Sequence, residues 1–160
     1  MTTDITTQEQ RQVILEQARK FPDWWIERVF AQKLWRMQIA VAQATFMYPR
    51  VTVRSCQSAG KTYIAARIAL AFLYNYSPAT VITTGPTNRQ VEDILWREIR
   101  LAFSQSGVPL EGNLTRKALD LNENRFAVGF ATDEPERMLG YHNVNVLVIG
   151  DDAAGLTNDI

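Results

Sequence analysis

The fold of this chain is best inferred from one stretch of its sequence, Ser55-Cys56-Gln57-Ser58-Ala59-Gly60-Lys61-Thr62. Residues 50–54 before it alternate polar and apolar side chains as a short strand does, and residues 63–74 after it have a helical pattern. Backbone N–H groups of a small-residue loop and of a helix N-terminus favour an anion between them. The stretch therefore predicts a nucleotide phosphate site, in which Lys61 reaches the β- and γ-phosphates and the Thr62 hydroxyl is a ligand of Mg²⁺.

All eight residues of the loop are expected to bind the nucleotide: Ser55, Cys56, Gln57, Ser58, Ala59, Gly60, Lys61 and Thr62. Loops of this type usually open with glycine, and Ser55 stands at that position. A chance Gly-Lys-Thr in an ordinary turn is the alternative interpretation. The strand pattern before the loop and the helix pattern after it favour the phosphate site, because the mechanism needs both.

The composition is that of an ordinary globular chain of one domain, with 46% hydrophobic and 21% charged residues. Seventeen Lys and Arg balance seventeen Asp and Glu, which gives no support to tight nonspecific nucleic-acid binding but leaves room for a local basic stripe. The single cysteine, Cys56, excludes an internal disulfide and fits a reducing compartment. The polar N-terminus and the short apolar runs lead us to expect a cytoplasmic protein with no membrane partner.

Two regions are expected along the chain. Residues 7–20 and 23–46 carry apolar residues at helical spacing, with Pro22 between them. We therefore expect a helical N-terminal segment over residues 1–49, followed by a nucleotide-binding core over residues 50–160.

Within the core, residues 79–84 predict a strand that ends at Gly85. Thr87, with Gln90 three positions later, predicts a capping box at the start of a helix. That helix is expected to place its apolar side chains on one face: Val91, Ile94, Leu95, Ile99, Ala102 and Phe103.

Residues 114–121 and 125–130 are strand-like runs on either side of a turn and predict a hairpin. Residues 144–149 are largely apolar, as in a strand buried on both faces. Together with residues 50–54 and 79–84, this last strand alternates with helices. The order predicts an α/β fold, a parallel sheet with flanking helices.

Two carboxylates, Asp151 and Asp152, follow that last strand. The carboxyl ends of parallel strands face the crevice where ligands bind in such sheets. Asp151 is expected to hold the Mg²⁺ beside Thr62, and Asp152 to polarise the attacking water. Two aspartates that cap a loop or a helix start are the alternative.

These segments, in this order, resemble the ATPase domain of phage terminase large subunits, which are DNA-packaging motors. The resemblance runs from about Phe21 to Leu156. It includes Lys33-Leu34-Trp35-Arg36-Met37-Gln38, the Gly-Lys-Thr loop, Thr83-Thr84-Gly85-Pro86-Thr87, Leu139-Gly140-Tyr141-His142 and the strand before the acidic pair. The loop alone occurs in many unrelated NTPases, whereas the ordered set is far more specific.

The resemblance implies a P-loop NTPase of the ASCE, or RecA-like, class that uses ATP and Mg²⁺ to move double-stranded DNA. It implies that Gln38 and Trp35 lie near the adenine; from helical spacing alone, Trp35 would be assigned to the core. Lys61 and Asp152 become the expected catalytic residues, and Thr62 and Asp151 the metal ligands. The expected partners are duplex DNA, a small terminase subunit, a portal, and further copies of the chain in a ring.

The sequence departs from that family in three ways. The family has Asp-Glu after the strand, whereas Asp152 is shorter than glutamate by one methylene, which puts hydrolysis more in doubt than binding. Gln57 stands where the family often has an arginine. The chain also ends at Ile160, with no nuclease domain and without a later strand that lies between the two nucleotide-site strands in this class. We therefore expect an incomplete sheet with open edges.

Two alternatives remain open from the sequence. One is a nucleotide-binding remnant without turnover, and the other is a helicase-like NTPase. Among the basic residues, Arg116, Lys117 and Arg125 form a candidate DNA-contact cluster, and any arginine finger would come from Arg89, Arg97, Arg100, Arg125 or Arg137. The only histidine, His142, is expected at the surface.

Overall fold

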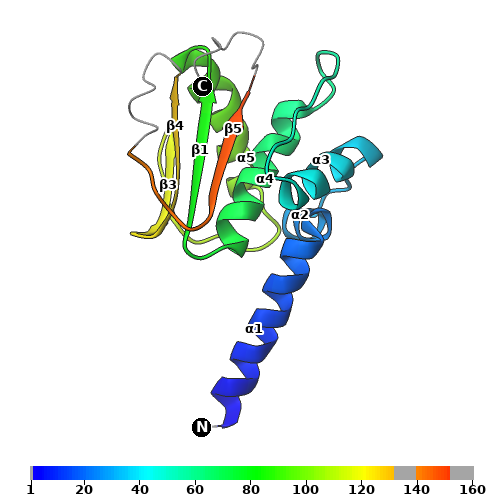
Figure 1. The fold of residues 1–160 in the computed structure, drawn as a ribbon, viewed down its shortest axis with the longest axis vertical. Coiled ribbons are helices and arrows are strands. Elements are labelled where there is room, and N and C mark those ends of the chain that lie inside the picture. The colour runs from blue at the N-terminus through cyan, green and yellow to red at the C-terminus, as the bar shows by residue number, and fades with distance from the viewer. Residues whose placement is uncertain (1, 132–139, 152–160) are drawn as a thin grey trace.

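The computed structural model describes residues 2–131 and 140–151 and shows an α/β fold built on a five-stranded mixed sheet. The strands lie in the order β2-β3-β4-β1-β5 (Figure 1). β1 (Ala79–Gly85) pairs in parallel with β4 (Arg125–Ala131) on one side and with β5 (Val146–Gly150) on the other. β2 (Asn113–Leu114) and β3 (Ala118–Asn122) continue the sheet beyond β4 in antiparallel pairing.

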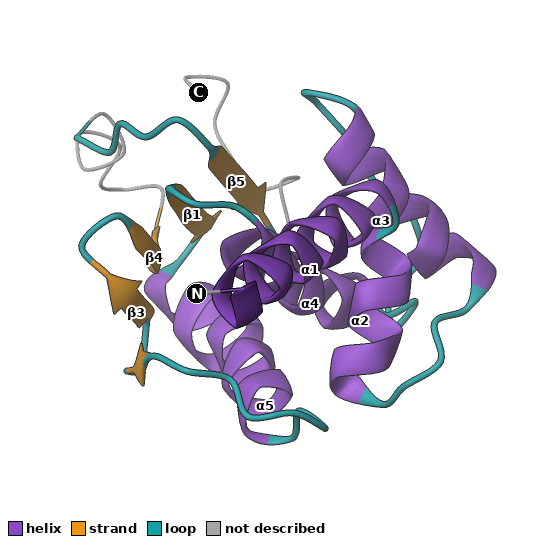
Figure 2. Cartoon of the chain, turned by 90° about the horizontal axis from the view of Figure 1, so that it is seen from below, coloured by secondary structure: helices purple, strands orange, loops and turns teal. Residues whose placement is uncertain are grey.

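The helices lie together on one side of the sheet (Figure 2). α4 (Lys61–Asn75) is the most buried and contacts β1, β4 and β5. η1 (Gln90–Trp96) and α5 (Arg97–Ser104) pack beside it. α1 (Thr2–Lys20), α2 (Pro22–Phe30) and α3 (Arg36–Met47) each contact α4, and α1 extends away from the body of the molecule (Figure 1). No helix in the described part of the chain is both long and apolar enough to cross a bilayer.

The prediction of a purely parallel sheet is wrong in two respects. The hairpin of β3 and β4 forms as expected, but β4 joins β1 and makes the sheet mixed. Residues 50–54 are not a strand: Val51 and Val53 are 38% and 40% exposed. Alternating apolar side chains indicate that a segment can pair as a strand. The strand forms only where a neighbouring strand supplies backbone hydrogen bonds.

The last strand is an edge rather than a strand buried on both faces. Among the described strands, β5 pairs with β1 alone. Val146 and Val148 are 41% and 50% exposed, whereas Leu147 and Ile149 pack against the core. The face of β5 that carries Leu147 and Ile149 therefore joins the core, and its other face is half open.

The helix after β1 begins as predicted but contains a π-helical segment. The Gln90 N–H donates to Thr87 Oγ1 at 3.2 Å, so Thr87 is the expected cap. From Gln90 to Trp96 the chain is π-helical, with wider turns that bring residues five apart onto one side. Val91 and Trp96 are therefore both buried, and Ile94, expected in the core, is 48% exposed.

Trp96 locks this helix to the sheet. Its side chain is fully buried, and its indole Nε1 donates to Thr83 Oγ1 in β1 at 2.8 Å. The ring lies directly over Gly129 in β4: a Cβ added there would be 2.1 Å from Nε1 and 2.9 Å from Thr83 Oγ1. Only glycine leaves room for the indole to reach its acceptor.

We expect Gly129→Ala to destabilise the fold, at the upper end of the range of about 1–3 kcal/mol for overpacked cores. The reason is that the added methyl must displace Trp96 or break its hydrogen bond. Gly107→Ala is the matched control, since its nearest neighbours would be in ordinary contact at 3.4 Å. Denaturant unfolding of both variants measures the difference; equal free energies of unfolding would contradict the close packing of Trp96.

Candidate phosphate-binding site

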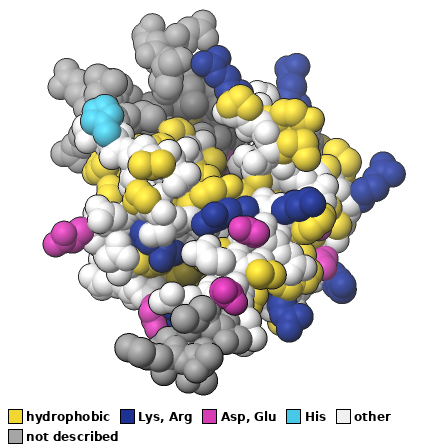
Figure 3. All heavy atoms as spheres, turned by 60° about the horizontal axis from the view of Figure 1, so that its bottom comes forward, with side chains coloured by type: hydrophobic (Ala, Val, Ile, Leu, Met, Phe, Trp, Pro, Cys, Tyr) yellow, Lys and Arg dark blue, Asp and Glu magenta, His cyan; other side chains and the backbone are white. Residues whose placement is uncertain are grey.

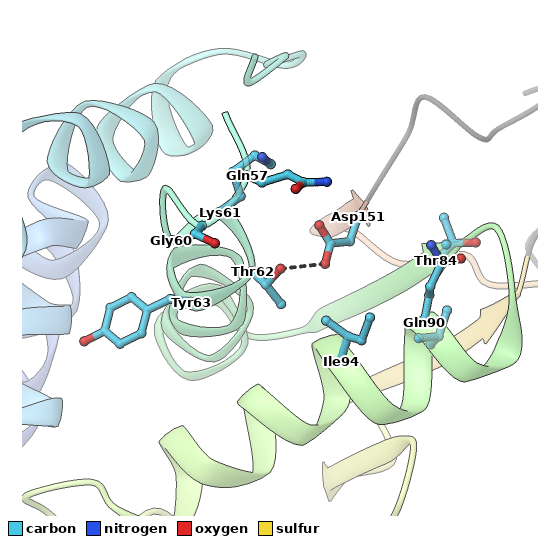
Figure 4. A pocket seen from close by; sticks show the side chains of 12 residues that line it. Gln57, Gly60, Lys61, Thr62, Tyr63, Thr84, Gln90, Ile94 and Asp151 are labelled. Atoms are coloured by element: carbon cyan, nitrogen blue, oxygen red, sulfur yellow. Dashed lines mark hydrogen bonds between the residues drawn. The ribbon is translucent and has the colours of Figure 1, made fainter. Parts of the chain in front are cut away.

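A cavity of about 350 Å³ opens at the carboxyl end of the parallel strands, a volume at the lower end for small-molecule sites. Its walls come from the loop and start of α4, from the end of β1, from η1 and from the residue after β5 (Figure 4). The lining residues are Gln57, Ser58, Gly60, Lys61, Thr62, Tyr63, Thr84, Gly85, Gln90, Val91, Ile94 and Asp151. Segments far apart in the sequence thus meet where open α/β sheets bind ligands.

The loop wall adopts a backbone conformation that few residues favour. Ser58 and Gly60 have φ values of 61° and 81°, both left-handed. Gly60 is the N-cap residue of α4, so the loop leads directly into a helix N-terminus. Such a turn followed by the first N–H groups of a helix is suited to an anion.

The Lys61 ammonium lies against the loop. It donates to the carbonyl oxygens of Ser55 and Cys56 at 3.3 and 3.0 Å, and to Ser55 Oγ at 3.3 Å. Ser55 and Cys56 therefore hold the lysine, and they do not line the cavity, nor does Ala59. The Cys56 thiol is exposed and free.

Thr62 and Asp151 join the two halves of the site. The Thr62 hydroxyl donates to Asp151 Oδ2 at 2.9 Å, across 89 positions of sequence (Figure 4). Asp151 is placed by the sheet, because its N–H donates to the Thr84 carbonyl at 3.0 Å. A hydroxyl and a carboxylate at this separation are oxygen donors of the kind that Mg²⁺ prefers.

These two residues fit a magnesium ion that also binds substrate phosphates. The described residues contain no group of three or more His, Cys, Asp or Glu side chains able to hold a metal by themselves. Magnesium is commonly held by one or two protein carboxylates together with phosphate oxygens and water. One carboxylate, one hydroxyl and a neighbouring lysine match that pattern.

The upstream residues Trp35 and Gln38 lie beside the loop rather than in the cavity. Gln38 is 9% exposed, and its Oε1 accepts from the Trp35 N–H at 3.3 Å. Its Nε2 would be 2.9 Å from a Cβ added at Gly60, so the amide packs directly on the loop. The Trp35 side chain is 51% exposed, so its assignment to the core from helical spacing is wrong.

The structure adds one wall that sequence reasoning missed. Gln90 and Ile94 point from η1 into the cavity (Figure 4), although Gln90 was expected only as a helix cap and Ile94 only in the core. Their position next to a strand-end Gly85 is the signal that could have identified them, because that strand end faces the crevice. Asp152, the expected water activator, lies outside the described residues.

The remaining candidates divide between structural and surface roles. Arg125 donates to the carbonyls of Leu73 and Tyr74 at the end of α4, so it does not belong with Arg116 and Lys117 in a basic cluster. Burial lowers the pKa of Arg125, and burial raises the pKa of the neighbouring Tyr74 to about 12. His142 is exposed (Figure 3, cyan), as expected, and Arg137 lies outside the described residues.

No protein-family model matches the chain, and comparisons with curated proteins and with solved structures find no match either.

We expect Gly60→Ala to destabilise the loop for two separable reasons. A left-handed alanine costs about 1–2 kcal/mol, and the new methyl must also displace Gln38. In a Gln38→Ala background the second cost disappears, so Gly60→Ala should cost less there than in the parent chain. Denaturant unfolding of the parent chain, the two single variants and the double variant gives this difference. The same loss of unfolding free energy in both backgrounds would show that Gln38 does not pack on the loop.

Proposed function

We propose that this chain is the ATP-binding and ATP-hydrolysing core of a DNA-packaging motor of the terminase type. The observation that carries the proposal is the hydrogen bond from Thr62 to Asp151, which joins a Gly-Lys-Thr loop to a carboxylate at the end of a parallel strand. Phosphoryl transfer needs mainly positioning and charge neutralisation, and this pairing supports both.

In this proposal the residues of the site have separate roles in binding and hydrolysis. The loop N–H groups and the start of α4 bind the phosphates of ATP, and the Lys61 ammonium exchanges its contacts with the loop carbonyls for the β- and γ-phosphates. Thr62 and Asp151 hold Mg²⁺, which when bound neutralises charge on the phosphates. Asp152 orients the attacking water and accepts its proton.

Trp35 and Gln38 are the proposed adenine-side residues. Trp35 supplies a half-exposed aromatic ring on which a base can stack. Gln38 supports the loop through its contact with Gly60. Duplex DNA, a small terminase subunit, a portal and a ring of identical chains follow from the resemblance to terminases and belong to the same proposal.

Binding is tested first, by titrating the purified chain with ATP and magnesium. We expect Lys61→Ala to weaken ATP by about tenfold to hundredfold, the usual loss for a hydrogen bond to a charged group. Lys20→Ala is the matched control, because Lys20 is an exposed lysine of α1 that does not line the cavity. Equal affinities for the parent and Lys61→Ala chains, or no binding by either, would refute the phosphate site.

Turnover is tested separately, with duplex DNA present. Because an aspartate places its carboxylate farther from the water, we expect Asp152→Glu to raise the rate of ATP hydrolysis by up to about 10²-fold. Activity in Asp152→Glu alone would identify a nucleotide-binding remnant without turnover. Stimulation by single-stranded rather than duplex DNA would favour the helicase-like alternative. An Asp152→Glu rate below that of the parent chain would contradict the role given to Asp152.

A further inference from the structure

Five basic side chains gather on one surface beside the phosphate cavity. The helix that includes η1 and α5 carries three of them, Arg89 in its first turn and Arg97 and Arg100 in α5. The loop between β2 and β3 carries the other two, Arg116 and Lys117. We call this the η1 basic surface. Within residues 2–131 and 140–151, two acidic residues, Glu92 and Asp93, have ion pairs with it. The local excess of positive charge stands out in a chain whose charges balance overall.

Side-chain contacts join the helix and the loop into one surface. Arg116 pairs with Glu92, and Arg100 donates to the Arg116 carbonyl at 2.5 Å. Lys117 Nζ donates to Asn88 Oδ1 at 3.1 Å, so its charge is matched by a neutral amide rather than by a carboxylate. The surface is therefore held in place by contacts that leave much of its charge uncompensated.

The two most available arginines lie on the helix. The Arg89 side chain is 88% exposed, and its pairing with Asp93 at 4.0 Å is at the limit of an ion pair. Arg97 is exposed as well, four residues beyond Asp93. Arg89 and Arg97 line a second hollow, together with Thr87, Gln90, Asp93 and Ile94.

The second hollow adjoins the phosphate cavity. Gln90 and Ile94 line both, from the same short π-helical segment. A ligand held by Arg89 and Arg97 would therefore contact the element that forms one wall of the nucleotide site.

We propose that the η1 basic surface binds the backbone phosphates of duplex DNA, with Arg89 and Arg97 as separate phosphate contacts on either side of Asp93. This inference rests on the proposed function and assigns the place where its DNA partner lies. Arginine forks match phosphate oxygens, and a cluster of exposed cations is suited to contact with the DNA backbone. The surface is expected to bind without sequence preference.

Because the two hollows share lining residues, DNA binding at the η1 basic surface is coupled to nucleotide binding in the cavity. DNA bound at Arg89 and Arg97 biases the position of Gln90, and nucleotide bound at the cavity does the same from the other side. By linkage, each ligand must then change the affinity for the other by the same factor.

The test measures binding of a labelled 30-base-pair duplex to the full chain by fluorescence anisotropy over a range of salt concentrations. The double variant Arg89→Ala/Arg97→Ala is compared with Arg11→Ala/Arg36→Ala, which removes two exposed arginines elsewhere and the same net charge. We expect the first to weaken binding by about tenfold or more and to lower the salt slope by about two, and the second to stay within about twofold. Lys117→Ala should lower the slope by about one.

Three results would overturn the inference: no duplex binding by the parent chain, equal losses in the two double variants, or displacement of the duplex by poly-glutamate as efficiently as by unlabelled DNA. ATP titration of the same proteins separates this inference from the proposed function. Arg89→Ala/Arg97→Ala should bind ATP as the parent chain does when DNA is absent, whereas Lys61→Ala should bind ATP more weakly and keep its affinity for DNA. Melting temperatures confirm that each variant is folded.

Discussion

The buried strand β1 is the constraint on which the rest of the structure depends. All seven of its residues are buried, and it is hydrogen-bonded to parallel strands on both sides. Its Thr84 carbonyl accepts from Asp151, and its Thr83 hydroxyl accepts from Trp96. The two walls of the cavity on the sheet side, Asp151 and η1, are therefore positioned by adjacent residues of one strand, the first by the Thr84 backbone and the second by the Thr83 side chain.

One side of the cavity is formed by the core of the protein, and the other side by an exposed loop. The sheet end and α4 belong to the hydrophobic core, and they hold Asp151 and Thr62 at hydrogen-bond distance. The loop of residues 51–58 is exposed, and it is fastened to the fold by Gln38 against Gly60 and by Lys61 against the loop carbonyls. A phosphate bound at the loop would replace the contacts of Lys61 while the hydrogen bond between Thr62 and Asp151 stayed in place.

The sequence predicted the local elements well and the pairing of strands poorly. Apolar spacing and capping residues identified the helices, β1 and the hairpin, because these depend on neighbours along the chain. Residues 50–54 were expected in a strand, but whether a segment pairs depends on a remote neighbour that alternation does not reveal. The exposure of Ile94 and burial of Trp96 could not be predicted either, since a π turn is stabilised by the tertiary contact of Trp96 with Thr83 and Gly129. For the site, the Gly-Lys-Thr signature led to Thr62, and the end of the last strand led to Asp151; the two residues lie together. Gln90 carried no signature beyond its capping role.

The π-helical turn also bears on how this chain tolerates changes in length. A π turn holds one more residue than an α-helical turn, so deleting a single residue between Thr87 and Arg97 would restore regular α-helix. A π turn closes about the same rotation with its additional residue as an α-helical turn does without it, so the side chains on either side of the deletion would keep their directions. Gln90 could stay at the cavity and Trp96 at Thr83. A deletion elsewhere in the helix would instead turn every side chain beyond it by about 100°. The π-helical segment is thus the part of this helix in which the chain can lose a residue without turning the packed face away from the sheet.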